Sequence, residues 1–151
     1  MKDPLKYAYL LLKFRLRTEK EIRERMKRKG FSDKQIEKTI EKLKNQGFLK
    51  KGEFLREFIQ SRMLKPHSRR RIAFELRRFG FEEEEIQNAL DSYYNDTDVE
   101  EIIKNHILEH FGSEMKISRK DLERLINYYK YRGFSTGYIV NLVKSLGFRI
   151  H

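Results

Sequence analysis

The residues whose type and spacing best suit anion binding are three consecutive arginines, Arg69, Arg70 and Arg71. A guanidinium group is planar and offers paired donors, so such a cluster can grip a phosphate or a carboxylate at two points. Ser68 indicates a helix start at this place, where positive charge opposes the helix dipole. Because local stability does not explain the arginines, we interpret them as a clamp for phosphates or acidic side chains. The alternative is a solvated corner in which Arg69 and Arg70 face water and Arg71 pairs with Glu75.

A second basic set lies on one predicted helix face near the amino terminus and consists of Lys20, Arg23 and Lys27, with Arg28 directly after it. The i to i+4 rule pairs Glu21 with Arg25 and Glu24 with Arg28, and it leaves the first three without a partner. We interpret them as a further anion-binding surface, the alternative being an ordinary solvated helix face. Basic residues also stand at two other predicted helix ends, where they would compensate the dipole as well: Arg77, Arg78, Lys130 and Arg132.

Three tyrosines follow one another closely in the last third of the chain. Tyr129 falls in register with the apolar face of its predicted helix and is expected in the core. Tyr128 and Tyr131 could instead stack on unpaired bases or pack at a protein interface, where an amphipathic ring is useful. Simple edge packing is the alternative for both.

Signatures of catalysis are scarce. His106 and His110 have the spacing of a helical metal-binding pair, but no HExxH motif, cysteine or acidic third ligand accompanies them. No Walker-type glycine-rich loop and no Ser or Cys constellation is present. We therefore expect neither an enzyme nor a metal site, and no cofactor.

Composition favours an anionic partner. The 151 residues carry 34 Lys and Arg against 23 Asp and Glu, a net charge of +11, and residues 1–48 alone account for +8. Such an excess attracts nucleic acid first and acidic protein surfaces second. The chain has no cysteine, no stretch that resembles a signal peptide and no apolar run of membrane-spanning length. We expect a cytoplasmic, monomeric protein that does not bind membranes.

The positions of these residues are set by an internal repeat of about 50 residues, marked by Gly-Phe pairs that begin at Gly30, Gly80 and Gly133. Apolar residues recur four and eight positions before each glycine and six, ten and thirteen positions after it, ending at Tyr93 in the second repeat. These spacings form one face of a helix on both sides of a turn. Ser or Thr residues at the expected helix starts agree with this pattern: Thr18 with Glu21, Ser32, Ser118 and Ser135.

A third amphipathic helix precedes each pair, at 5–16, 53–63 and 99–111, and no strand pattern is evident. We predict an all-α protein, an elongated tandem array of three three-helix repeats with nine helices. The repeats would cover residues 1–48, 49–97 and 98–151. One unit of this size is marginal alone, so neighbouring units must stack to complete their cores.

The joint spacing of residues 47–81 resembles a motif of the RecX family, the bacterial regulators of the RecA recombinase. The matching positions are Gly47, Phe48, Leu49, Phe54, Leu55, Phe58, Arg62, Arg71, Ile72, Glu75, Leu76, Gly80 and Phe81. The resemblance continues on both sides, for example at Met26, Gly30 and Arg132. The chain departs from the family at Lys50 and Lys51, where an acidic pair is usual, and at Ser68, where glycine is common.

This resemblance implies a non-enzymatic modulator, mainly an inhibitor, that binds in the groove of the RecA filament on single-stranded DNA. It would limit filament growth, strand exchange, ATP hydrolysis and coprotease activity. An extended basic array suits such a role, because many weak contacts along a polymer multiply through effective concentration. Two alternatives stay open: a stand-alone protein that binds DNA, including double-stranded DNA, through helix-turn-helix-like units, and a helical scaffold for another acidic protein.

Overall fold

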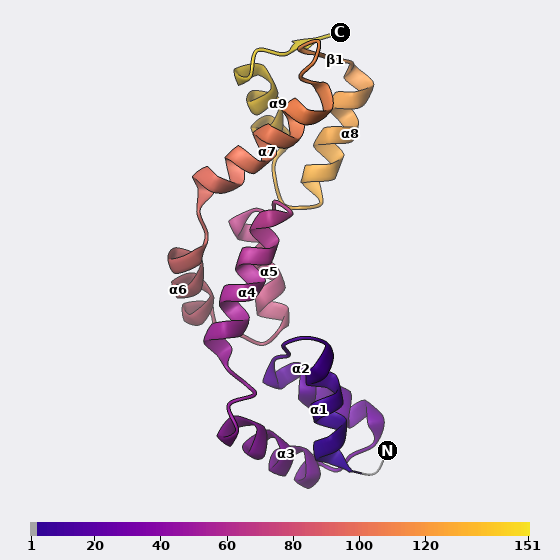
Figure 1. Ribbon diagram of the computed structural model, residues 1–151, viewed down its shortest axis with the longest axis vertical. Helices are drawn as coiled ribbons and strands as arrows, with labels where there is room; N and C mark the ends of the chain where they lie inside the picture. Colours follow the sequence, from indigo (N-terminus) through magenta and orange to yellow (C-terminus); the bar gives the residue numbers. More distant parts are fainter. Residues whose placement is uncertain (1–2) are drawn as a thin grey trace.

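A computed structural model describes residues 3–151, and over this range the chain folds into nine helices grouped in threes. The three groups stack end to end in an elongated, gently curved molecule with the two chain ends at opposite extremes (Figure 1). We call them the first, second and third units. Their helices are α1 (Pro4–Phe14), α2 (Glu19–Lys29) and α3 (Asp33–Asn45); α4 (Lys51–Leu64), α5 (Arg69–Arg78) and α6 (Glu83–Tyr93); and α7 (Asp96–Phe111), α8 (Arg119–Lys130) and α9 (Thr136–Ser145).

The predicted all-α array is confirmed, with small shifts at its boundaries. The helix expected from residue 99 begins at Asp96, because the side chain of Asn95 accepts a hydrogen bond from the amide of Asp98 and caps it. The expected boundary after residue 97 therefore falls inside the first turn of α7. No helix among residues 3–151 is both long and apolar enough to cross a bilayer.

Each unit has its own apolar core, because the face predicted by the repeat is buried. Ile22 and Met26 of α2 are fully buried, and so are Ile72 and Leu76 at the equivalent places in α5. The exceptions are Leu146, which is only partly buried, and Tyr93, which is 36% exposed at the end of α6. The next residue turns inward instead, as described below for the junction between units.

The helix ends follow the capping chemistry that the sequence indicates. Thr18 and Glu21 form a reciprocal capping box at the start of α2. The hydroxyl groups of Ser32, Ser118 and Ser135 each accept a backbone hydrogen bond in the first turn of their helices.

The second and third units are joined through a glycine turn. Gly133, with a φ of +94°, lies against the start of α5, where an added Cβ would come 2.7 Å from the Cβ of Arg71 and would overlap Ser68. The amide of Ser68 donates to the carbonyl oxygen of Arg132 at 2.8 Å. Met63 and Tyr94 pack against the cores of both units, and the Tyr94 hydroxyl donates to the carbonyl oxygen of His67 at 2.9 Å.

The first and second units meet in the same way but more lightly. Gly80 approaches Lys20 at the start of α2, and Lys20 Nζ donates to the carbonyl oxygen of Arg78 at 3.1 Å. Leu16 packs against the core of the second unit. Gly30 has the same backbone conformation, with a φ of +103°, but nothing lies within 4 Å of a Cβ placed there.

A short parallel β pair closes the third unit, which the absence of strand patterns did not predict. Residues Lys116–Ile117 (β1) pair with Arg149–Ile150 (β2) at the top of the molecule in Figure 1. The amide of Arg119 also donates to the carbonyl oxygen of His151 at 3.0 Å. The expectation of no strands is wrong here because two-residue strands are too short to show an alternating pattern.

Candidate nucleoprotein-binding surface

The start of α5 lies at the centre of the molecule and positions the three consecutive arginines. The hydroxyl of Ser68 accepts from the amide of Arg71 at 3.1 Å, which fixes the first turn of the helix. From this turn the side chains diverge. Arg71 lines two neighbouring hollows beside α5. Of the other two consecutive arginines, Arg70 lines one of these hollows and Arg69 lines neither.

Arg71 is held in place by an ion-pair network around Glu75. The Nε of Arg71 lies 3.2 Å from Glu75 Oε1, and the Nε of Arg62 lies 2.8 Å from Glu75 Oε2. The guanidinium of Arg62 lies over the ring of Phe58, 4.3 Å from its centre. One carboxylate therefore orients two arginines through their Nε atoms, and their terminal nitrogens take no part in these two contacts.

The hollow between α2 and α5, which we call the upstream hollow, has a volume of about 470 Å³. Six basic side chains and three acidic ones line it, together with Phe79: Lys20, Arg25, Arg28, Arg62, Arg71 and Arg78, and Glu21, Glu24 and Glu75. The lining of the upstream hollow thus carries more positive than negative charge, and it is formed by the first and second units together.

The hollow between α5 and the turn after α8, which we call the downstream hollow, has a volume of about 440 Å³. Its lining contains four basic residues and no acidic one: Arg70, Arg71, Phe74, Arg77, Lys130, Tyr131 and Gly133. Because the two hollows share Arg71, they form one basic surface that passes over all three units. We call it the basic strip.

The basic residues predicted in the first unit do not stay together. Lys20 and Arg28 line the upstream hollow, whereas Arg23 turns to the other side and pairs with Glu19 at 3.2 Å and with Glu37 of α3. The expectation that Arg23 lacks a partner was wrong for two reasons. Glu19 stands four positions before it, which the i to i+4 rule itself covers, and Glu37, 14 positions away, reaches it only when α2 and α3 pack. Lys27 is exposed and lines neither hollow.

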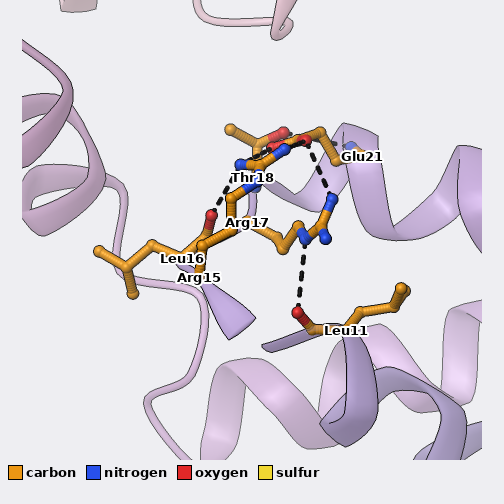
Figure 2. Close-up of polar contacts among 6 residues, drawn as sticks. All are labelled: Leu11, Arg15, Leu16, Arg17, Thr18 and Glu21. Carbon is orange, nitrogen blue, oxygen red and sulfur yellow. Dashed lines mark hydrogen bonds and ion pairs between the residues drawn. The ribbon is translucent and has the colours of Figure 1, made fainter. Parts of the chain in front are cut away.

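The expected pairs within α2 are also replaced by other ones. Neither Glu21 with Arg25 nor Glu24 with Arg28 forms an ion pair in the described chain. Glu21 instead forms ion pairs with Arg15 and Arg17, with nitrogen–oxygen distances of 2.5 Å and 3.7 Å (Figure 2).

Arg17 takes part in a second contact at the same corner. Its Nε donates to the carbonyl oxygen of Leu11 at 3.4 Å, and its side chain is only 10% exposed (Figure 2). Burial lowers the pKa of the Arg17 guanidinium, and the neighbouring charge of Arg15 adds to this effect. Arg15 and Arg17 therefore fasten α1 to α2 through Glu21.

Two arginines of the second unit are held by acidic residues of α6. Arg69 lies 2.5 Å from Asp91 and 3.0 Å from the side-chain oxygen of Gln87, so it joins α5 to α6. Arg77 forms a forked pair with Glu83, with both contacts at 2.7 Å. This pair lowers the pKa of Glu83 to about 2, with a smaller contribution from Gln87. Arg69 therefore binds Asp91 and Gln87 of its own unit. Neither of our interpretations of the three arginines, a clamp for an external anion or a corner facing water, predicted this contact.

The residues predicted at the end of α8 divide between two surfaces. Tyr131 is 82% exposed and lines the downstream hollow with Lys130. Tyr128 lines neither hollow. The guanidinium of Arg132 lies over its ring, 3.8 Å from the ring centre. Arg132 also donates to the carbonyl oxygen of Tyr128 at 3.1 Å. The structure thus brings Tyr131 and Lys130, but not Tyr128 and Arg132, beside the arginines of α5.

The two histidines of α7 make contacts within the third unit. His106 Nδ1 lies 2.5 Å from the hydroxyl of Tyr129, which is buried as predicted. His110 donates from Nδ1 to the carbonyl oxygen of His106 at 2.9 Å. Burial raises the pKa of Tyr129. Burial also lowers the pKa of His106, and the nearby His110 lowers it further.

Sequence reasoning missed four basic or aromatic members of the basic strip, namely Arg25, Arg62, Phe74 and Phe79. The first two were assigned to an internal pair and to a family motif. Phe74 had a usable signal, because it lies out of phase with the apolar positions Ile72 and Leu76 on the same helix. Its side chain is 46% exposed, and a phenylalanine is unusual at such an exposed position because most phenylalanines are buried.

Comparison with known proteins agrees with this architecture. Residues 5–43 match the family described as RecX, first three-helix domain, and residues 52–90 match RecX, second three-helix domain. A regulatory protein RecX from Thermotoga maritima is 35% identical over 146 residues, which cover 96% of this chain and 85% of that protein. The RecX of Caldanaerobacter subterraneus subsp. tengcongensis is 30% identical, over 96% of this chain and 70% of that protein.

A solved structure shows the same fold. The crystal structure of RecX from Lactobacillus salivarius superposes with a TM-score of 0.67 at 18% identity, and the match covers 95% of this chain and 94% of that one. Two matching three-helix domains, relatives that align over 96% of this chain and the shared fold lead to one conclusion: this chain belongs to the RecX family of non-enzymatic regulatory proteins.

Proposed function

We propose that this protein regulates the RecA recombinase by lying along the RecA filament on single-stranded DNA. It would occupy the helical groove and limit filament growth, strand exchange, ATP hydrolysis and coprotease activity. The single observation that carries this proposal is the basic strip, in which Arg71 links two hollows that together pass over all three units. A partner that is itself extended and anionic can engage such a strip at several points at once.

The elongated shape supports the same function. Each unit has a separate core, so the strip is spread along the molecule instead of being gathered in one pocket (Figure 1). Individually weak contacts at the upstream and downstream hollows would then add up through effective concentration. Family membership makes RecA the first partner to test, and single-stranded DNA within the filament the second.

The test uses RecA on single-stranded DNA with the purified protein added below stoichiometric amounts. We expect the wild type to slow ATP hydrolysis and strand exchange, and we expect Arg70→Glu combined with Lys130→Glu to lose most of this inhibition. The matched control is Lys38→Glu with Lys42→Glu. It reverses two charges on α3, where neither lysine lines the strip or pairs with an acid in the described chain.

Three outcomes would count against the proposal. Unchanged ATP hydrolysis and strand exchange at every ratio would remove RecA as the partner. Equal loss of inhibition in the control variant would replace the strip by a general charge effect. Tight, sequence-specific binding to duplex DNA without RecA would instead favour a stand-alone DNA-binding protein.

A further inference from the structure

The downstream hollow holds two aromatic rings that the fold does not bury. Phe74 of α5 is 46% exposed and Tyr131 after α8 is 82% exposed, and neither belongs to the core of any unit. The two rings come from different units and lie in the lining of the same hollow. Exposed apolar rings brought together by a junction indicate a surface on which a ligand packs.

The charges around these rings are positive and partly uncommitted. Arg71 and Arg77 are shared with Glu75 and Glu83, as described above. The guanidinium of Arg71 also lies 5.4 Å from the centre of the Phe74 ring, a looser contact than the one over Tyr128, and Phe74 keeps 46% of its surface exposed. Arg70 and Lys130, by contrast, are exposed and form no ion pair with any residue of the described range 3–151. A ligand with negative charge beside a flat apolar group fits this combination.

We propose that the downstream hollow is a stacking site for an unpaired base of single-stranded DNA, with Phe74 and Tyr131 as the stacking surfaces. Arg70 and Lys130 hold the flanking phosphates. Aromatic side chains beside a basic groove are the general means by which proteins bind single strands without reading their sequence. Bases of a duplex are already stacked and paired, so the rings select single strands over duplex DNA.

This inference rests on the proposed function, which places single-stranded DNA at the basic strip. An acidic protein surface would use the cations of the hollow equally well. It would have no need of two exposed rings from neighbouring units, and for this reason we assign the hollow to a base. Binding of an acidic protein therefore becomes an outcome of the test.

The experiment measures binding of the full chain to fluorescein-labelled oligothymidylate and to an abasic oligonucleotide of the same length, by fluorescence anisotropy. The two probes carry the same phosphates and differ only in their bases. We expect the wild type to bind oligothymidylate roughly tenfold more tightly than the abasic strand. Phe74→Ala with Tyr131→Ala should remove this difference and leave the affinity for the abasic strand unchanged.

The matched control is Phe14→Ala with Tyr93→Ala, which removes two exposed rings that line neither hollow of the strip. It should keep the wild-type preference for bases. Circular dichroism melts of both variants check that the fold is retained, and Tyr131→Ala alone provides a second readout because that ring is almost fully exposed.

The possible results separate this inference from the proposed function. If the ring variant keeps the base preference while Arg70→Glu with Lys130→Glu loses DNA binding, stacking is wrong and the basic strip stands. If both variants bind DNA as the wild type does, neither the site nor DNA at the strip is correct. If the ring variant binds DNA normally but no longer binds RecA filaments, the rings contact protein, and the stacking site is overturned.

Discussion

The backbone amide of Ser68 donates a 2.8 Å hydrogen bond to the carbonyl oxygen of Arg132, and this bond ties the start of α5 to the turn after α8. The same turn contains Gly133, which must approach α5 closely for the bond to form. Two requirements therefore meet at one residue, a left-handed backbone and the absence of a side chain. They can be separated by experiment, because Gly30 shares only the first.

Replacing these glycines by alanine should have unequal effects on stability. Gly30→Ala adds a Cβ in open space at a φ of +103°, so it should cost only the left-handed strain of about 1–2 kcal/mol. Gly133→Ala adds the same strain and also pushes against Ser68 and Arg71, so it should cost clearly more. Urea unfolding of both variants measures the difference. Equal losses would show that the junction yields without cost.

Arg69 and Arg70 should separate stability from binding, although they are neighbours in sequence. Arg69→Gln breaks the contact with Asp91 between partly exposed side chains, so it should lower stability by at most about 1 kcal/mol and leave DNA affinity intact. Arg70→Gln should do the reverse. Its loss should reduce the slope of log affinity against log salt concentration by about 0.7, the value for one phosphate contact on a single strand. Identical salt slopes for both variants would contradict the assignment.

Glu75 should be more important for stability than other exposed-face carboxylates of the second unit. Its side chain is 17% exposed and it accepts from both Arg62 and Arg71, so Glu75→Gln leaves two neighbouring guanidinium groups without their counter-charge. We expect a loss of about 1–3 kcal/mol in unfolding free energy. Glu57→Gln, at an exposed position of α4, is the control, and it should change stability little. If Glu75→Gln leaves the unfolding free energy unchanged, water replaces the contacts of the carboxylate without cost.

The protein should lose stability as the pH falls below about 6.5, the ordinary pKa of histidine. Burial lowers the pKa of His106 and of His67, so below that pH the unfolded chain binds protons that the folded chain does not. This stability is present above the unfolded pKa and is lost as the pH falls through the lower folded values. Thermal melts from pH 7.5 to 5 should show a smaller decline for His106→Gln than for the wild type. An unchanged decline would place the effect in His67 or in carboxylates.

The two junctions should differ in how firmly they hold. Lys20→Met removes the side-chain contact with the carbonyl oxygen of Arg78, so the first unit should exchange its amide hydrogens faster near α2 while the second and third units are unaffected. In the wild type the amide of Ser68, which is bonded to the third unit, should exchange slowly. Fast exchange at Ser68 would show that the second junction also opens.

Local sequence was enough to predict the helices, because periodicity and capping act over a few residues. The buried positions of Ile22, Met26, Ile72 and Leu76 follow from spacing alone, and the capping box at Thr18 follows from residue type. Tyr93 shows the limit of this reasoning. It keeps the helical period but stands where α6 ends, so the core takes the following residue instead.

The directions of long charged side chains could not be predicted in this way. Arg23 binds Glu37 and Arg69 binds Asp91 across neighbouring helices, and these partners are 14 and 22 positions apart. Rules for pairs one turn apart within a helix do not extend to them. The basic strip likewise exists only because the turn after α8 folds against α5, which places Tyr131 beside Arg70.

The unequal junctions predict that the molecule bends mainly between the first and second units. The second and third units share side chains in their cores and a backbone hydrogen bond, whereas the first is attached through Leu16 and the flexible arm of Lys20. We therefore expect the first unit to turn through small angles relative to the other two, because no backbone hydrogen bond of the described residues joins it to the second unit. With such a joint, the protein could stay bound to a filament whose helical rise changes.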